Sequence, residues 1–220
     1  MTDASVQIGV TTDPIFGENA YTVFQREGGA CWIIDPGLPP HADEIASFVR
    51  SRRLQCTAIV LTHAHGDHIA GIDDVCAALG ALPIYLAREE WAALSDPDEN
   101  LSSLGGFGIT VQADDVRDLP PDSTLELDGL SWRVLDTSGH SPGGRSLNCS
   151  AARIVIVGDA LFAGSVGRVD FHHSDGARLL RNIRENLLSL PDETQVLAGH
   201  GAATTIGQER RANPFFVRLT

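Results

Sequence analysis

The sequence predicts an α+β fold in which two β-sheets pack against each other and helices cover their outer faces. Strand-like segments with β-branched residues are followed by amphipathic helical segments, and this order occurs twice along the chain. Short glycine-containing turns separate neighbouring strand segments, which is typical of hairpins. With 220 residues, 43% of them hydrophobic, the chain suits one compact domain over residues 1–220.

The first half begins with a hairpin around a Gly28-Gly29 turn, and Asp35-Pro36-Gly37 ends its last strand. Apolar residues at helical spacing, including Ile45, Phe48 and Val49, follow it. Gly80 ends a second helical segment. We expect strands at residues 6–10, 20–25, 31–34, 57–61 and 82–86, and helices at residues 42–54, 69–79 and 88–94.

Residues 95–122 are polar, acidic and rich in glycine, and they show no sustained periodicity, so we expect a long loop that is a candidate lid. The second half then repeats the pattern, with an Asp128-Gly129 hairpin turn. We expect strands at residues 123–127, 130–135, 145–149, 154–157 and 195–198, and a helix at residues 175–190.

The composition excludes several classes of partner. Asp and Glu number 29 against 16 Lys and Arg, a net charge of −13, and such a chain repels phosphate backbones, so we expect no nucleic acid partner. There is no apolar run of about 18 residues and no secretory signal pattern, so we expect a cytoplasmic protein without a membrane partner. The four scattered cysteines are expected to be reduced core residues. The oligomeric state cannot be predicted.

One short segment, His63-Ala64-His65-Gly66-Asp67-His68, concentrates three imidazoles and a carboxylate within six residues. It follows a buried strand directly, a position where loops often carry active sites. Nitrogen and oxygen donors of this kind suit zinc, iron(II) or manganese(II). The segment therefore predicts a metal site.

Three later residues occur in the same context, each just after a strand and beside a glycine: His140, Asp159 and His200. Singly, each has an ordinary structural explanation, such as a loop histidine or a helix cap. Together with the first segment they are interpreted as additional metal ligands.

With these residues the chain resembles the metallo-β-lactamase superfamily, whose signature is His-x-His-x-Asp-His followed by a distant His, an Asp and a final His. The resemblance implies an αββα sandwich and two divalent metal ions, with zinc first and iron or manganese as alternatives. It also implies that the first metal binds to His63, His65 and His140, the second to Asp67, His68 and His200, and that Asp159 bridges both.

Within this superfamily, a bridging Asp159 argues against true β-lactamases, and His65 in place of a glutamate argues against diiron flavoproteins. Residues 158–168 resemble the Gly-Asp-x-Leu-Phe…Gly-x-Gly-(Arg/Lys) segment of the glyoxalase II and persulfide dioxygenase branch. In glyoxalase II relatives the cation at this place holds a substrate carboxylate. Arg168 is therefore the expected substrate-binding residue.

Residues 199–215 resemble the end of short bacterial glyoxalase II-like hydrolases, so no separate C-terminal substrate domain is expected. The His172-His173 pair departs from the usual pattern after Arg168 and is interpreted as a solvated loop. His41 is interpreted as a surface residue at the start of a helix.

The expected function is therefore metal-dependent hydrolysis of a thioester, S-lactoylglutathione or a similar small acyl-thiol, by a metal-bridging hydroxide. Asp67, besides binding the second metal, is expected to relay a proton to the leaving group. The alternative is a persulfide dioxygenase with one iron bound to His63, His140 and Asp159. A lactonase and a non-enzymatic metal-binding protein are further alternatives.

Overall fold

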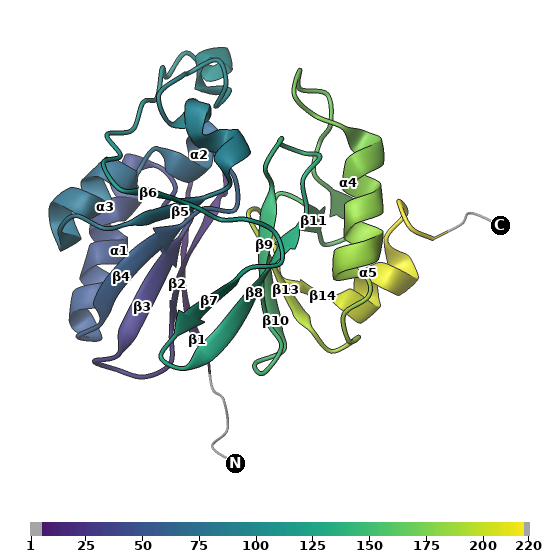
Figure 1. Ribbon diagram of the computed structural model, residues 1–220, viewed down its shortest axis with the longest axis horizontal. Helices are drawn as coiled ribbons and strands as arrows, with labels where there is room; N and C mark the ends of the chain where they lie inside the picture. The colour runs from purple at the N-terminus through teal and green to yellow at the C-terminus, as the bar shows by residue number, and fades with distance from the viewer. Residues whose placement is uncertain (1–5, 218–220) are drawn as a thin grey trace.

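Two six-stranded sheets pack face to face at the centre of the structure (Figure 1), a computed structural model that describes residues 6–217. The first sheet has the order β1 (Gln7–Thr12), β2 (Asn19–Phe24), β3 (Ala30–Ile34), β4 (Gln55–Val60), β5 (Ile84–Leu86) and β6 (Val116–Asp118). The second has the order β14 (Thr204–Thr205), β13 (Gln195–Ala198), β10 (Ile154–Gly158), β9 (Arg145–Cys149), β8 (Leu130–Asp136) and β7 (Thr124–Leu127). A small hairpin joins β11 (Leu161–Phe162) to β12 (Ser165–Val166).

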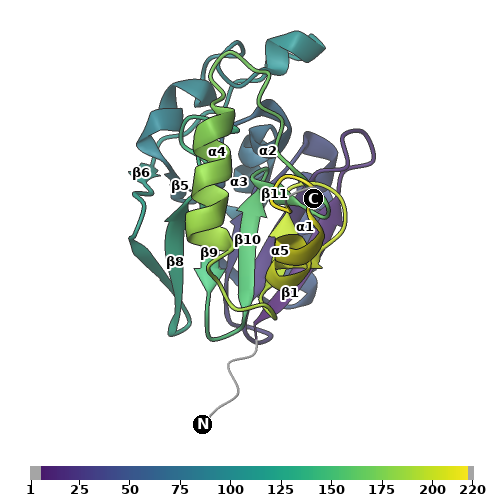
Figure 2. The ribbon, with the colours of Figure 1, turned by 90° about the vertical axis from the view of Figure 1, so that its right-hand side faces the viewer.

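Helices cover the outer face of each sheet, which gives the expected αββα order of layers. On the first sheet lie α1 (Pro39–Ser51) and α3 (Ile72–Leu79). On the second lie α4 (Gly176–Asn182), its π-helical continuation η3 (Ile183–Leu187), and α5 (Ile206–Ala212), seen from outside in Figure 2. The short helix α2 (Gly66–Ile69) and the 3₁₀ segments η1 (Arg88–Leu94) and η2 (Ser102–Gly105) lie at one end of the sandwich (Figure 1).

The central strands are apolar on both faces because each face packs against a different layer. In β3, Ile33 packs toward the helices of its own half, whereas Trp32 and Ile34 pack into the layer between the sheets. In β10, Ile156 enters the same central layer and Val157 packs against the helices of the second half. Such strands appear in the sequence as continuous apolar runs.

The predicted strands and most predicted helices are confirmed, but the helix expected at residues 69–79 is two helices. The chain breaks between α2 and α3 at Gly71, whose N–H donates to the carbonyl oxygen of Gly37 at 2.6 Å. A Cβ at Gly71 would lie 2.8 Å from the carbonyl oxygen of Pro36, so only glycine permits this approach. The close packing of two backbone segments therefore overrides helical periodicity.

The expectation that residues 95–122 form only a loop is wrong in part. This region contains η2 and the edge strand β6, which pairs in parallel with β5. Neither β14 nor α5 was predicted from the sequence. Helix α5 has only seven residues, which are too few to show a helical period. The side chain of Thr205 caps α5 by accepting a hydrogen bond from the backbone N–H of Gln208.

His41 is not a surface residue, contrary to expectation. Helix α1 begins at Pro39, so His41 lies in its first turn and is only 3% exposed. All four cysteines carry free thiols, as expected. Within residues 6–217, none of the helices combines the length and the apolar character that crossing a membrane requires.

Candidate metal centre

All seven predicted ligands meet at one end of the sandwich. They are His63 and His65 in the loop after β4, Asp67 and His68 in α2, His140 after β8, Asp159 after β10 and His200 after β13. Strand β10 is parallel to β13, and both β8 and β10 are antiparallel to β9, so β8, β10 and β13 end at the same edge of the second sheet. The strand directions thus bring together residues that are far apart in the sequence.

The first group consists of His63, His65 and His140, with a ligand nitrogen from each lying within 4.8 Å of the others. The Nδ1 atom of His65 lies 3.0 Å from Nε2 of His63 and 2.9 Å from Nε2 of His140. His63 and His140 are buried and His65 is half-buried. Three ring nitrogens that converge in this way can bind one metal ion.

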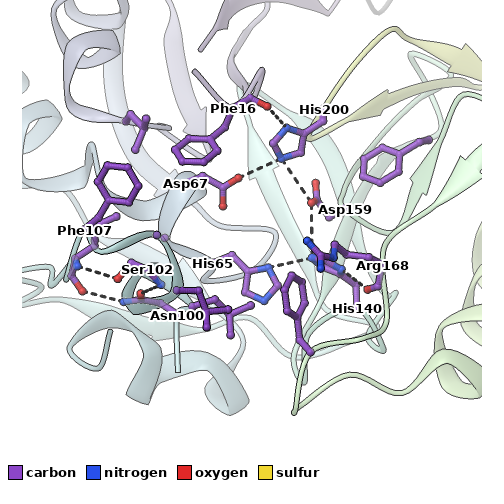
Figure 3. Close-up of a pocket in the computed structure, with 18 of the residues that line it drawn as sticks. Phe16, His65, Asp67, Asn100, Ser102, Phe107, His140, Asp159, Arg168 and His200 are labelled. Atoms are coloured by element: carbon purple, nitrogen blue, oxygen red, sulfur yellow. Dashed lines mark hydrogen bonds and ion pairs between the residues drawn. The ribbon is translucent and has the colours of Figure 1, made fainter. Parts of the chain in front are cut away.

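The second group consists of Asp67, His68 and His200, which also lie within 4.8 Å of one another. The Nε2 atom of His200 lies 3.3 Å from Oδ2 of Asp67. The other ring nitrogen of His200, Nδ1, lies 3.1 Å from the carbonyl oxygen of Phe16, which is placed to accept its proton. This contact directs Nε2 toward the group (Figure 3), as is usual for histidines that bind metals.

Asp159 lies between the two groups. Its Oδ2 atom is 3.6 Å from Nε2 of His140 in the first group and 3.6 Å from Nε2 of His200 in the second (Figure 3). Its Oδ1 atom is 3.5 Å from Nε2 of His68, and both of these buried atoms lack a hydrogen-bond partner among the described residues. Buried polar atoms without partners are costly, so this donor set fits divalent metal ions that would pair them.

The protonation of the site also favours a cation. Burial, followed by the neighbouring imidazoles, lowers the pKa of His63 and His65 well below the usual value, so these rings are neutral and can bind a metal. Burial alone would raise the pKa of Asp67, but His68 and His200 outweigh it and hold that pKa well below its usual range. Asp67 is therefore ionised.

His68 behaves differently because it faces several carboxylates. Burial would lower its pKa, but Asp67, Asp159 and Asp35 together raise it well above the usual value. Its proton must leave when Nε2 binds a metal, so metal binding at this position releases a proton.

Asp35 and Glu90 hold the ligand loops, and the sequence analysis assigned neither to the site. Asp35 is buried and accepts hydrogen bonds from the backbone N–H of Thr62 at 2.8 Å and its hydroxyl at 2.6 Å, and its Oδ2 lies 3.1 Å from Nδ1 of His68. Glu90 is 4% exposed and accepts from the backbone N–H groups of Ala64 and Gly143. A carboxylate directly after an apolar strand was the available signal for Asp35, whereas nothing local marks Glu90.

Two glycines beside the ligands permit close packing around the site. A Cβ at Gly199 would overlap the Asp159 carboxylate and lie 2.7 Å from Cε1 of His68. Gly158 has φ +51° and packs against the side chain of Thr62. The glycines noted beside the ligands in the sequence therefore have a steric role.

A cavity of about 580 Å³ opens above the seven residues. Its lining includes His65, Asp67, His140, Asp159 and His200 from the two groups, which lie around its floor (Figure 3). Most of the rest of the lining is apolar and comes from the loop before β2, the segment around η2, and the β11–β12 hairpin with the loop that follows it. Part of the candidate lid at residues 95–122 thus lines the cavity.

Arg168, the predicted substrate-binding residue, lines this cavity beside His140 (Figure 3). Its guanidinium donates two hydrogen bonds of 2.8 Å to the carboxylate of Asp170 and lies over the ring of Phe171, 4.4 Å from its centre. The carbonyl oxygen of Arg168 lies 2.8 Å from Nδ1 of His140, so this loop also orients a ligand.

His172 and His173 are exposed, as expected, and do not join the seven residues. The Nε2 atom of His173 lies 2.8 Å from a carboxylate oxygen of Glu99, on the loop before η2.

Comparisons with known proteins agree with the fold. A family model described as the metallo-β-lactamase superfamily matches residues 15–200. A probable metallo-hydrolase from Streptococcus pyogenes is 39% identical over 216 residues, covering 96% of this chain and 90% of the relative. The hydroxyacylglutathione hydrolase GloC from Haemophilus influenzae is 32% identical over 207 residues, covering 91% of this chain and 93% of the relative.

Solved structures are similar over nearly the whole chain. The BLEG-1 B3 metallo-β-lactamase has a TM-score of 0.87 and 36% identity, covering 97% of this chain and 100% of the other. The protein TTHA1623, solved in a di-iron-bound form, has a TM-score of 0.81 and 35% identity, covering 94% of this chain and 99% of the other. ETHE1 from Myxococcus xanthus, with a TM-score of 0.75 and 22% identity over 94% and 83% of the two chains, shares the fold.

Proposed function

This chain belongs to the metallo-β-lactamase superfamily, and we propose that it is a binuclear metal-dependent hydrolase that cleaves the thioester of a small acyl-thiol. The observation that carries the proposal is the position of Asp159, whose Oδ2 is equally far, 3.6 Å, from one histidine of each group. A carboxylate placed in this way can bind two ions at once. A site for one ion would not need this carboxylate to lie equally close to histidines of both groups.

Each metal would bind three side chains of its own and share Asp159. His63, His65 and His140 would hold the first, and Asp67, His68 and His200 the second. Two divalent ions held this close would lower the pKa of a water molecule between them and polarise the carbonyl of the substrate. Zinc is the expected metal, and iron or manganese suits the same donors.

Asp67 would also transfer a proton to the leaving group. It lines the cavity and one quarter of its side chain is exposed. A carboxylate in this position would accept the proton released during attack and return it to the leaving thiolate. Water and thioester would then yield a carboxylic acid and a thiol.

The thioester assignment rests on two further observations. Residues 158–168 resemble the segment of the glyoxalase II branch, and GloC, described as a hydroxyacylglutathione hydrolase, is a relative over more than 90% of both chains. Arg168 would bind a substrate carboxylate from the cavity wall. Its contact with Asp170 fixes the guanidinium there but also reduces its free charge.

The second candidate is β-lactam hydrolysis, since BLEG-1, described as a B3 metallo-β-lactamase, is 36% identical over nearly the full length. The sequence argues against this activity because Asp159 is expected to bridge the two metals. Measuring β-lactam hydrolysis therefore also tests whether Asp159 bridges them. A persulfide dioxygenase with one iron is the third candidate.

The test is to measure the metal content of the purified protein and three activities: thioester hydrolysis, β-lactam hydrolysis and oxygen uptake with glutathione persulfide. We expect two metals for each chain and thioester hydrolysis. One iron with oxygen consumption would support the dioxygenase instead, and β-lactam hydrolysis without thioester hydrolysis would support the second candidate.

The variant Asp159→Ala should lose activity and bind fewer than two metals while remaining folded. Asp114→Ala, the same substitution at an exposed position away from the cavity, is the matched control and should behave as the unmodified protein. Full activity in Asp159→Ala would refute the bridging role.

A further inference from the structure

One side of the cavity is an apolar wall that the proposed chemistry does not require. We call the lid wall the four residues Phe16, Leu104, Phe107 and Ile109, all of which line the cavity. The rings of Phe16 and Phe107 meet edge to face with centres 5.8 Å apart, although they lie on loops far apart in the sequence. In Figure 3 these two rings lie on the Asp67 side of the cavity, opposite Arg168.

The lid wall is exposed to an unusual degree. Leu104 is 74% exposed, Phe107 56% and Phe16 44%, so three large apolar side chains of one cavity remain open to water. Apolar side chains gathered in this way at a concave site typically mark a surface that a ligand covers.

The polar side chains in the same segment are already used within it. Both hydrogens of the Asn100 amide bind carbonyl oxygens, those of Ala93 at 2.8 Å and Ile109 at 2.9 Å, and its Oδ1 accepts from the N–H of Ser102. The hydroxyl of Ser102 accepts from the N–H of Ile109 at 2.8 Å. These bonds shape the segment, so it presents mainly apolar surface to the cavity.

The lid wall is also fixed relative to the ligands. The backbone N–H of Gly66, between His65 and Asp67, donates to the carbonyl oxygen of Asn100 at 2.8 Å. A Cβ at Gly66 would lie 2.9 Å from Cβ of Ser102 and 3.1 Å from Cδ1 of Ile109. A group that packs on the wall is therefore held at a set distance from the reacting bond.

Positive charge is scarce in the cavity. Among the described residues that line it, Arg168 is the one Lys or Arg side chain, and two of its nitrogens already bind the carboxylate of Asp170. The chain as a whole carries a net charge of −13. Apart from the metal ions that the centre would bind at its floor, a thiol carrier with several carboxylates or phosphates would therefore find little compensating positive charge here.

We infer that the substrate is a thioester with a bulky apolar acyl group and at most one negative charge, and that the acyl group packs against the lid wall. The inference rests on the proposed thioester hydrolysis and adds the substrate class. It moves the expected substrate from S-lactoylglutathione, a small polar acyl group on a carrier with two carboxylates, to an apolar acyl group on a nearly neutral carrier.

The test uses thioesters of N-acetylcysteamine, an uncharged thiol, with acyl chains from acetyl to hexanoyl, beside S-lactoylglutathione. With the metal-loaded protein, kcat/KM should rise about fourfold for each methylene that the wall buries. S-lactoylglutathione should be a poorer substrate than the hexanoyl thioester.

The variant Phe107→Ser should reduce the gain from acetyl to hexanoyl by about tenfold, because it removes a ring from the wall. Phe215→Ser is the matched control, since Phe215 is 47% exposed and lies outside the cavity lining, and it should leave the gain unchanged. Thermal unfolding of both variants checks that they are folded.

The outcomes separate the two proposals. Hydrolysis that is independent of chain length, or fastest with S-lactoylglutathione and unaffected by Phe107→Ser, would overturn the inference and leave thioester hydrolysis intact. If no thioester is cleaved, the proposed function fails. The binding affinities of hexanoate and acetate, measured by calorimetry, then test whether the lid wall binds an apolar chain. Equal binding of the two acids, or equal binding of hexanoate by Phe107→Ser and the unmodified protein, would overturn it.

Discussion

The substitution Asp35→Asn tests whether a buried carboxylate outside the seven ligands determines metal affinity. Asp35 accepts from the N–H and the hydroxyl of Thr62, and it lies 3.1 Å from Nδ1 of His68. The carboxylate can only accept, so Nδ1 of His68 carries a proton and Nε2 is the atom directed at the second group. Asp35 also has φ +46°, a left-handed conformation that Asn tolerates, so the backbone should be preserved.

In the variant, the amide can still accept from the N–H of Thr62 through its oxygen, but its NH₂ group would face Nδ1 of His68. That arrangement stabilises the opposite tautomer, with the proton on Nε2, which cannot bind a metal. Partners of this kind typically contribute a factor of about 10 to 100 in metal affinity, or about 1.4 to 2.7 kcal/mol. We expect a loss of this size for the ion bound by His68 and a smaller change for the other.

The assay is a titration of the metal-free protein with zinc against a chelator of known affinity, which resolves the two binding steps. Asp122→Asn is the matched control, because Asp122 also has positive φ, +64°, and lies on the surface, paired with Arg133. If Asp35→Asn binds both ions as tightly as the unmodified protein, or if the control loses as much affinity, the reasoning is wrong.

Two further predictions concern residues around the centre. Burial raises the pKa of Tyr21 above its ordinary value near 10, so the folded state keeps this proton longer than the unfolded state, and stability is retained below pH 10 and falls above it. Urea unfolding between pH 7 and 11 should show this fall in stability in the unmodified protein and in the control Tyr85→Phe, but a smaller fall in Tyr21→Phe. The Tyr21→Phe variant should also lose about 1 kcal/mol of stability at pH 7, because it lacks the hydrogen bond to the carbonyl oxygen of Ala198. Identical pH profiles for both variants would contradict the assignment. Gly199→Ala should destabilise the protein by about 1–3 kcal/mol and weaken metal binding, because its Cβ would press on Asp159 and His68. Unchanged metal content and unfolding midpoint in that variant would show that the site has more room than the structure gives it.

The sequence alone determined the layers of the fold and the donors of the site. Apolar runs such as residues 154–157 and the turn at Asp128-Gly129 identify strands because these signals are local. Helical boundaries at Gly71 and the strand β6 were missed, since they depend on segments that pack against them from elsewhere. The seven predicted ligands lie together because each follows a strand or lies in the short helix α2 at one end of the sandwich.

Tertiary structure decided how those donors are held and what lies above them. Asp35 contacts His68 across 33 positions of the chain, and Glu90 joins the loops of Ala64 and Gly143, so no spacing rule could reveal either contact. The same holds for the pairing of Phe16 with Phe107 above the cavity. A metal-binding motif records which atoms are present, whereas the orientation of those atoms and the surface offered to a substrate depend on the packing of distant segments.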